Sequence, residues 1–358
     1  MNKLIVNLED KTYPIYITTD FFDFGKCLSS RGIGKKLVVI TDKNVEKNQW
    51  QAFSEALDGS GFEIFKYVID AGEVNKTLDT VKGIYEFLVS QKLDRKASLI
   101  ALGGGVVGDI TGFAAATFLR GINFIQVPTT ILSQADSSVG GKVGVDFNGY
   151  KNIIGAFYQP KFVYMNVSTL KTLPLREIRA GMAEVVKHGV ICDRDFFEYI
   201  DYNVDRIFKL NPNVLEYLAK QNCTIKANVV EQDEKEAGLR AILNFGHTIG
   251  HAIEAHSNFG LLHGEAISIG MVGAFRLAVK LEMVGEDQMM KLTKLLAKLG
   301  LPTSYHEMDA EKILELMYHD KKVKNEKLFF ILPKAIGEVV EVGIDDKKLI
   351  KEVLEGLK

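Results

Sequence analysis

The 358-residue sequence has few cysteines, a single tryptophan and almost no excess of either charge, and these shortages exclude several classes of protein. Its three cysteines, Cys27, Cys192 and Cys223, lie far apart and match neither a disulfide framework nor a zinc finger. The formal net charge of −2 gives no electrostatic basis for binding nucleic acid or a membrane surface. No stretch approaches the roughly 20 apolar residues of a membrane span, and the N-terminus has no run of signal-peptide length. We therefore expect a cytoplasmic protein without nucleic-acid or membrane partners.

The first half of the chain alternates between strand and helix patterns. Residues 4–8 and 13–18 alternate as in a β-hairpin. Further strands are predicted at 36–41, 63–69, 98–102 and 123–127, separated by helical patterns at 45–57, 78–91 and 110–118. Strands that alternate with helices favour a parallel sheet covered on both faces, so we predict an α/β N-terminal domain.

The pattern changes to long amphipathic stretches after about residue 170. Helices are predicted at 176–190, 194–210, 214–232, 263–281 and 286–299, together with one around the histidines near residue 250. A short strand at 328–332 and a final helix at 345–357 follow. We predict a mostly α-helical C-terminal domain, with the chain divided into residues 1–165 and 166–358.

Three of the seven histidines, His247, His251 and His263, lie within one short stretch. His247 and His251 are four residues apart and share one face of a helix, a spacing that can present two imidazoles to a metal ion. Glu184, in Ala-Gly-Met-Ala-Glu-Val-Val-Lys-His-Gly, has a comparable setting. Two histidines and one carboxylate with an open position form a catalytic divalent-metal site. The alternative is a pair of helix histidines that make ordinary hydrogen bonds.

A glycine-rich loop follows the predicted strand 98–102. Gly103, Gly105 and Gly108 fit the pattern G-x-G-x-x-G between a strand and a helix, which suits a pyrophosphate. The loop is not in the first βα unit, and no acid ends the following strand, so it departs from the usual dinucleotide fingerprint. Asp42, with Asn44 beside it, ends an earlier strand and is our candidate for the adenosine ribose. Tight packing is the alternative reason for the glycines.

Residues 128–152 are poor in large apolar side chains and rich in hydroxyls, glycines and cations. Lys142, Lys151 and Asn152 lie in a frame that could wrap an anion, because lysine binds phosphate as a point charge. Lys226 and Arg240 precede the histidine helix, and arginine in particular can hold a carboxylate with two parallel bonds. A solvated loop and solvated helix cations are the alternative. Together these residues suit a small substrate with several negative charges.

Seven motifs occur in the order of one known family. They lie at residues 72–76, 103–109, 128–142, 173–177, 181–187, 244–254 and 263–266. On these motifs the sequence resembles the 3-dehydroquinate synthases nearly end to end. The resemblance implies a Rossmann-like N-terminal domain, a helical C-terminal domain and an active site in the cleft between them. It also implies NAD and one divalent metal ion, Zn²⁺ or Co²⁺, as cofactors.

The resemblance assigns site residues motif by motif. It makes Glu184, His247 and His263 the metal ligands, in place of the pair His247 and His251, and puts His251 near the substrate. The implied NAD contacts are Asp42, Asn44, Glu73, Lys76, Gly105, Val106, Asp109, Thr129, Thr130, Lys142 and Lys151. The implied substrate contacts are Asp136, Lys142, Asn152, Lys187, Lys226, Arg240, Asn244 and His251. Arg120 resembles an arginine that reaches the neighbouring subunit, which implies a homodimer, and either Lys321 or Lys322 would face the substrate.

The implied reaction converts a sugar phosphate, 3-deoxy-D-arabino-heptulosonate 7-phosphate, into 3-dehydroquinate and phosphate in the shikimate pathway. Three alternatives remain. A related cyclase whose substrate lacks a carboxylate would not need both Lys226 and Arg240. A dehydrogenase resembling glycerol dehydrogenase would have little use for the lysine-rich loop. A non-catalytic NAD-binding regulator should have lost some of the metal ligands, and here all three are present.

Overall fold

The computed structural model describes the whole chain except residues 237, 259, 320–322 and 325–326. The chain forms two units, Met1–Leu173 with Leu210–Glu234, and Pro174–Lys209 with Lys235–Lys358. This division differs from the predicted single cut at residue 165, because the chain returns to the first unit between residues 210 and 234. No helix in the described part of the chain combines the length and the apolar content of a membrane span.

The first unit is built on a seven-stranded sheet in the order β1-β2-β9-β6-β5-β3-β4. Only the pair of β1 and β2 is antiparallel, and the remaining pairs are parallel. The strands are β1 (Asn2–Val6), β2 (Tyr13–Thr18), β3 (Lys36–Asp42), β4 (Glu63–Ile69), β5 (Ser98–Gly103), β6 (Asn123–Pro128) and β9 (Val163–Asn166). The predicted α/β domain with a parallel sheet is confirmed, and β9 is a strand that the sequence reading missed.

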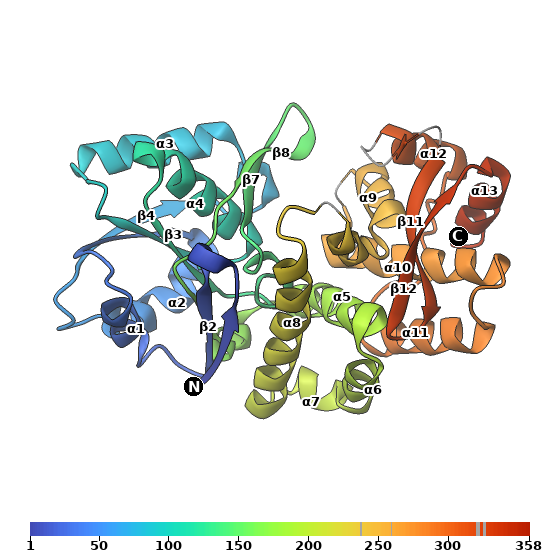
Figure 1. Ribbon diagram of the computed structural model, residues 1–358, viewed down its shortest axis with the longest axis horizontal. Coiled ribbons are helices and arrows are strands. Elements are labelled where there is room, and N and C mark those ends of the chain that lie inside the picture. The colour runs from blue at the N-terminus through green and yellow to red at the C-terminus, as the bar shows by residue number, and fades with distance from the viewer. Residues whose placement is uncertain (237, 259, 320–322, 325–326) are drawn as a thin grey trace. The chain divides into compact units, whose positions relative to one another are not determined.

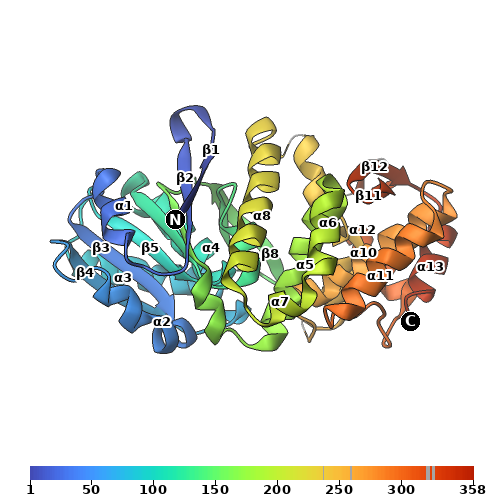
Figure 2. The ribbon, with the colours of Figure 1, turned by 90° about the horizontal axis from the view of Figure 1, so that it is seen from below.

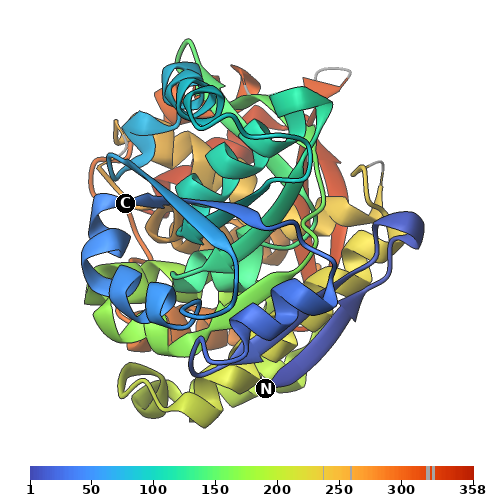
Figure 3. The same ribbon diagram turned by 90° about the vertical axis from the view of Figure 1, so that its left-hand side faces the viewer.

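Two apolar cores cover the two faces of this sheet. Along β3, Val38 and Ile40 pack with helices α3 (Leu78–Ser90) and α4 (Gly105–Thr117), whereas Leu37 and Val39 pack with α1 (Phe24–Ser30) and α2 (Lys43–Glu55). Successive strand residues point to opposite faces, which explains why an unbroken apolar run serves both cores. Figures 1 and 3 show α3 on one side of the sheet and α1 and α2 on the other.

Helix α8 (Pro212–Gln232) belongs to the first unit, whereas the sequence reading put it in the second. It packs beside β1 and β2, as Figure 2 shows. Glu231 accepts hydrogen bonds from Asn7, and Cys223 contacts Met165 in β9. The periodicity of the helix predicted its existence but contained no information about its partners.

The first unit is completed by a hairpin of β7 (Lys142–Phe147) and β8 (Tyr150–Phe157) and by short helical turns. The turns are Glu9–Lys11, η2 (Glu73–Asn75), η3 (Phe118–Arg120), η4 (Ser133–Ser137, a π-helical turn) and η5 (Val167–Thr172). Part of the lysine-rich segment, which could have been a plain surface loop, is therefore ordered as η4 and β7.

The second unit is mostly helical, as predicted. Its helices are α5 (Leu175–Cys192), α6 (Arg194–Tyr202), α7 (Val204–Phe208), α9 (His247–His256), α10 (His263–Lys280), α11 (Glu286–Lys298), α12 (Ala310–His319) and α13 (Lys347–Glu355), with the turn η6 (Leu239–Asn244). The predicted helix 194–210 is interrupted at Asn203. The unit also carries a three-stranded sheet of β10 (Val323–Lys324), β11 (Lys327–Ala335) and β12 (Glu338–Ile344), of which only part of β11 was predicted.

Candidate active site

The predicted NAD contacts follow the carboxyl ends of neighbouring parallel strands in the first unit. Asp42 ends β3, Glu73 and Lys76 follow β4, the glycine loop follows β5, and Thr129 and Thr130 follow β6. In open α/β sheets this edge is where ligands bind. Helix α4 already begins at Gly105 rather than near Ile110, so Gly105, Val106 and Asp109 lie in its first turns.

Two of these residues, Asp42 and Gly108, also stabilise the fold. The Oδ1 atom of Asp42 accepts hydrogen bonds from the backbone N–H of Asn44, at 2.8 Å, and of Val45, at 3.0 Å, and so caps α2. A Cβ at Gly108 would lie 2.8 Å from Oε1 of Gln126 in β6, so this glycine lets α4 approach the sheet. The alternative reading of the glycines as packing residues therefore holds for Gly108 without excluding a ligand at the start of α4.

Lys76 is buried and lies at the centre of a polar network in the first unit. Its Nζ atom lies 2.7 Å from Oδ2 of Asp109 and 3.8 Å from Oε1 of Glu73, and it donates a hydrogen bond to Oδ1 of Asn152. Nζ of Lys151 lies 3.9 Å from the same oxygen of Glu73. Burial lowers the pKa of Lys76, but Asp109 and Glu73 outweigh it and raise the pKa, so the ammonium stays charged.

The predicted substrate residues of the first unit fall into two groups. Nζ of Lys226, on α8, lies 2.7 Å from Oδ1 of Asp136 in η4 and is buried. Lys142 begins β7 on the same hairpin as Asn152. Arg120, in contrast, is exposed beyond the C-terminal end of α4, about 20 Å along that helix from the glycine loop. The structure therefore does not bring Arg120 to the other predicted residues of its own chain.

The three predicted metal ligands come together in the second unit. Oε1 of Glu184, on α5, lies 3.6 Å from Nε2 of His247 and 3.4 Å from Nε2 of His263. Ligand atoms of His247, His251 and His263 all lie within 4.8 Å of one another. Bonds of about 2.0–2.2 Å from nitrogen and oxygen to zinc are compatible with such separations. Glu184, His247 and His263 thus fit one divalent cation, and His251 lies at the same place.

Glu184 is the part of this cluster that a cation would complete. Its side chain is fully buried, and neither carboxylate oxygen accepts a hydrogen bond from a described residue. Lys187, one turn further along α5 and equally buried, forms an ion pair with it. A buried carboxylate without hydrogen bonds is costly unless another cationic partner is bound.

Neighbouring groups orient the histidine rings. Nδ1 of His247 lies 3.0 Å from the carbonyl oxygen of Phe245, which can only accept, so Nδ1 carries the proton and Nε2 is left as the ligand atom. Nδ1 of His263 lies 3.6 Å from Oε2 of Glu254, while its Nε2 faces Glu184. A carboxylate or carbonyl behind a ligating imidazole is the usual arrangement at metal sites.

Burial and neighbouring charges strongly shift the pKa values of the ionisable groups in this cluster. Burial opposes the charge of Glu184, but Lys187, His247 and His263 hold its pKa well below the usual value. Burial lowers the pKa of His247 well below its usual value. Burial also disfavours a charged His263, but Glu184 and Glu254 raise its pKa to about 9. His263 would have to release this proton to hold a metal ion through Nε2, because a ligating imidazole is neutral.

The start of α10 is clamped to α5, and this clamp places His263 beside Glu184. The guanidinium of Arg176 holds Glu265 with two bonds, Nε to Oε1 at 2.8 Å and an NH2 nitrogen to Oε2 at 2.7 Å. Glu265 in turn accepts a hydrogen bond from the backbone N–H of Leu262 and caps α10. Gly264 permits the close approach, since a Cβ there would lie 1.8 Å from the carbonyl oxygen of Ala180.

The other predicted residues of the second unit surround the helix of the histidines. Arg240 is buried in η6, and Asn244 ends this turn directly before α9. The side chain of Asn244 donates to Oε1 of Glu236 at 2.9 Å. Lys321 and Lys322, the candidates for a further substrate lysine, lie outside the described residues.

The sequence reading missed Glu236, Glu254 and Asp146, which support predicted residues. A signal for Glu254 was available, because it follows His247 by seven residues and so lies on the same face of α9. Glu236 and Asp146 meet their partners through turns, which periodicity does not reveal.

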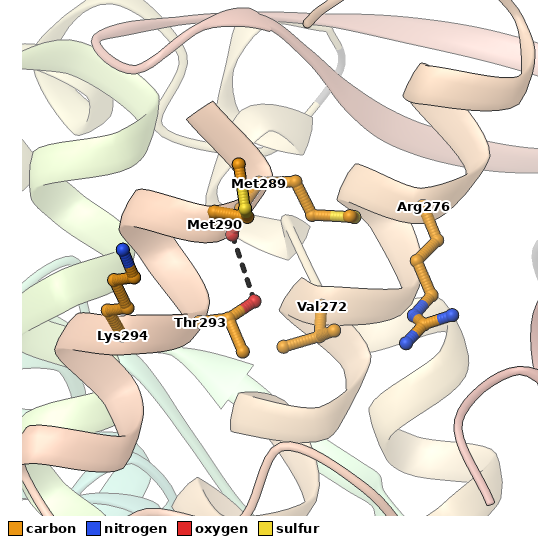
Figure 4. Close-up of a pocket in the computed structure, with 6 residues that line it drawn as sticks. All are labelled: Val272, Arg276, Met289, Met290, Thr293 and Lys294. Carbon is orange, nitrogen blue, oxygen red and sulfur yellow. Dashed lines mark hydrogen bonds between the residues drawn. The ribbon is translucent and has the colours of Figure 1, made fainter. Parts of the chain in front are cut away.

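A separate hollow in the second unit lies between α10 and α11. Figure 4 shows its lining, which consists of Val272, Arg276, Met289, Met290, Thr293 and Lys294. The one hydrogen bond drawn there, from Thr293 to the carbonyl oxygen of Met289, closes within α11. None of the predicted site residues lines this hollow, so it is not part of the candidate active site.

Comparisons with known proteins agree with this site. A family model described as 3-dehydroquinate synthase N-terminal matches residues 66–180, and one described as 3-dehydroquinate synthase C-terminal matches residues 181–323. The 3-dehydroquinate synthase of Acetivibrio thermocellus is 62% identical over 358 residues, covering 100% of this chain and 99% of the relative. That of Ruminiclostridium cellulolyticum is 57% identical over 349 residues, covering 98% and 97%.

Solved structures show the same fold. A 2-deoxy-scyllo-inosose synthase complexed with carbaglucose-6-phosphate, NAD⁺ and Co²⁺ matches with a TM-score of 0.92 and 28% identity, covering 100% of both chains. A 2-epi-5-epi-valiolone synthase from Streptomyces hygroscopicus, with NAD⁺ and Zn²⁺ bound, matches with a TM-score of 0.89 and 23% identity, covering 98% of both chains. At the latter identity the match shows the fold alone.

The parallel sheet with its strand-end polar residues, and the buried carboxylate beside three histidines, define an enzyme with the architecture of the sugar-phosphate cyclases. Within that class the chain belongs to the 3-dehydroquinate synthase family. The predicted family, fold class and enzyme type are confirmed, and the family gives the chain its place in the shikimate pathway.

Proposed function

We propose that the chain binds NAD at the strand ends of its first unit and one divalent metal ion, Zn²⁺ or Co²⁺, on Glu184, His247 and His263. With these cofactors it converts 3-deoxy-D-arabino-heptulosonate 7-phosphate into 3-dehydroquinate and phosphate. The observation that carries this proposal is the fully buried carboxylate of Glu184, which faces Nε2 of two histidines and accepts no hydrogen bond from the described residues.

The cofactors and the chain have different parts in this reaction. NAD, when bound, supplies a transient oxidation of a ring alcohol and is regenerated, and the metal ion, when bound, supplies Lewis-acid polarisation of substrate oxygens. Glu184 and the two ligating histidines hold the metal ion. In the first unit we assign Lys142 and Asn152 to the phosphate and Lys226 to the carboxylate. In the second unit we assign Lys187 to the phosphate and Arg240 to the carboxylate.

In this proposal the remaining polar residues bind the nucleotide and orient the substrate. Asp42, Asn44, Glu73, Lys76, Asp109, Thr129, Thr130 and Lys151 hold the nucleotide, with Gly105 and Val106 at the start of α4. Asp136, Asn244 and His251 position the substrate by hydrogen bonds. Catalysis then depends largely on fixed geometry and fixed charge, because cofactors and substrate supply the bond chemistry.

The assignment of the substrate carboxylate rests on the chemistry of two buried cations. Lys226 is 5% and Arg240 3% exposed, and a guanidinium such as that of Arg240 can hold a carboxylate with two parallel hydrogen bonds. A cyclase whose substrate lacks a carboxylate would not need both cations. If Arg240→Leu turned over the heptulosonate phosphate with an unchanged KM, the assignment of Arg240 to the carboxylate would be wrong.

The metal site is tested with His263→Ala against a matched control. His306→Ala is the control, because His306 is exposed and outside the cluster. We expect His263→Ala to lose bound metal and turnover together, while His306→Ala keeps both. Metal content is measured by mass spectrometry after equilibration with Zn²⁺ or Co²⁺. Full metal content with normal turnover in His263→Ala would contradict the site.

We also propose a homodimer in which Arg120 serves the partner's site. Leu119 and Arg120 both have left-handed backbones, with φ of 50° and 67°, and such strain persists where function requires it. Phe147 and Tyr150, an exposed apolar pair at the tip of the hairpin of β7 and β8, offer a surface for a second copy.

Mixing two inactive variants tests this arrangement. Arg120→Ala mixed with His263→Ala should recover about a quarter of wild-type activity, since half of the dimers then contain one complete site. A monomeric mass in solution, or no recovery on mixing, would refute it.

We further propose a cytoplasmic location, which agrees with three free cysteines, because free thiols suit a reducing compartment.

A further inference from the structure

The hairpin of β7 and β8 has an irregular register near its tip. Val145 pairs with Ile154, whereas Phe147 pairs with Tyr150. Asp146 on β7 therefore lies opposite residues 151–153 on β8. Such a bulge interrupts the ladder and changes the direction of side chains, and bulges are common beside active sites.

Three hydrogen bonds close a ring at this bulge. The backbone N–H of Asp146 donates to the carbonyl oxygen of Lys76 at 2.8 Å. Nζ of Lys76 donates to Oδ1 of Asn152. The backbone N–H of Asn152 donates to Oδ1 of Asp146 at 2.7 Å. Each of the three residues thus fixes the other two.

The ring includes Asn152 in a left-handed conformation. Its φ is 52°, a region that asparagine adopts more readily than most residues with a side chain. The bond from its N–H to the Asp146 carboxylate is a local interaction that stabilises this conformation. The same ring is anchored in the nucleotide network, because Nζ of Lys76 also lies 2.7 Å from Asp109.

We propose that Asp146 is a positioning residue that fixes the bulge and so couples the nucleotide-binding lysine Lys76 to the phosphate-binding residue Asn152. This inference rests on the proposed function, in which Lys76 contacts NAD and Asn152 contacts the substrate phosphate. Asp146 itself touches neither ligand and acts through the ring. When Lys76 binds NAD, Asn152 is then already oriented to bind the substrate phosphate.

The test compares Asp146→Ala, which removes the acceptor, with Asp146→Asn, which keeps an acceptor oxygen and removes the charge. Asp146→Ala should raise KM for the heptulosonate phosphate and Kd for NAD by about tenfold, because a hydrogen bond to a charged group is lost. Its kcat should fall less. Asp146→Asn should stay within about twofold of wild type. In Asp146→Ala the amide of Asn152 should also exchange its hydrogen faster.

Asp94→Ala is the matched control. Asp94 is exposed, and its Oδ1 also accepts a hydrogen bond from a backbone N–H, that of Lys96 at 2.8 Å. It lies before the N-terminal end of β5, however, whereas the candidate nucleotide site follows the carboxyl end. A wild-type KM and NAD affinity in Asp146→Ala, or equal losses in Asp146→Asn and Asp146→Ala, would overturn the inference. A lower melting temperature with unchanged KM would do the same, because it would show a structural role alone.

Lys76→Ala and Asn152→Ala, measured in parallel, separate this inference from the proposed function. If both impair binding while Asp146→Ala does not, the positioning role is wrong and the site assignment stands. If neither impairs NAD affinity or KM, the assignment of these residues to the ligands is wrong, and the inference falls with it.

Discussion

Glu184→Gln tests the buried ion cluster in the second unit most sharply. The substitution keeps the shape of the side chain and removes its charge, while Lys187, at 1% exposure, stays beside it. Removing one partner of a buried ion pair costs about 3–5 kcal/mol, because the attraction that offset the desolvation of the two charges is lost. For a domain of this size each kcal/mol corresponds to roughly 2–4 °C in melting temperature, so the metal-free variant should melt roughly 10 °C lower than wild type.

The response to metal is the second readout of this variant. A metal ion at one hundred times its Kd should stabilise the wild type by about 2.7 kcal/mol, whereas Glu184→Gln should gain little. Thermal denaturation with and without Zn²⁺ or Co²⁺ measures both effects. Glu198→Gln, an exposed change on α6, should stay within about 0.5 kcal/mol of wild type. A Glu184→Gln variant with wild-type stability and a wild-type metal response would refute the account of this cluster.

The remaining predictions concern the two cofactor sites. Asp42→Ser should keep the cap of α2, and therefore stability, but raise Kd for NAD about tenfold, because serine is too short to reach a ribose; unchanged affinity by calorimetry would remove Asp42 from the nucleotide site. Gly264→Ala should destabilise the protein by about 1–3 kcal/mol and weaken metal binding, because its Cβ would collide with Ala180 and push α10 from α5. A fully stable Gly264→Ala with normal metal affinity, measured by denaturation and metal titration, would show that this contact does not position His263.

The elements that the sequence predicted best are those whose periodicity is uninterrupted. Strands β3 to β6 and helices α5, α10 and α11 lie within a few residues of their expected bounds. Their apolar residues recur at the period of the element, and the buried strands are nearly continuous apolar runs. Local pattern was sufficient there because each element buries one face or both along its whole length.

Elements that depend on distant partners were not predictable in this way. Helix α8 has an ordinary amphipathic pattern, and its place in the first unit depends on contacts such as that of Glu231 with Asn7. Strands β9 and β12 are short or half-exposed and show no clear alternation. The bulge at Asp146 arises from hydrogen bonds between residues more than five positions apart, which no local period records.

The same distinction between local sequence patterns and contacts with distant residues applies to the candidate site. The i, i+4 spacing correctly indicated that His247 and His251 share a face, and the structure puts both beside His263. Spacing could not show that Glu184, more than sixty residues earlier, meets them, because α5 and α10 come together through Gly264 and the Arg176–Glu265 clamp. The sequence setting of Glu184 made it a candidate carboxylate, and the resemblance to a family then assigned it as a ligand together with His247 and His263.

The most direct test of the central claim follows three products in one reaction. Metal-loaded protein is incubated with NAD and 3-deoxy-D-arabino-heptulosonate 7-phosphate, and phosphate, 3-dehydroquinate and NADH are measured together. We predict equal amounts of phosphate and 3-dehydroquinate, no accumulation of NADH, and loss of both products on chelation. Accumulation of NADH in step with substrate consumption would indicate a dehydrogenase, and the absence of any turnover with NAD bound would show that this sugar phosphate is not the substrate.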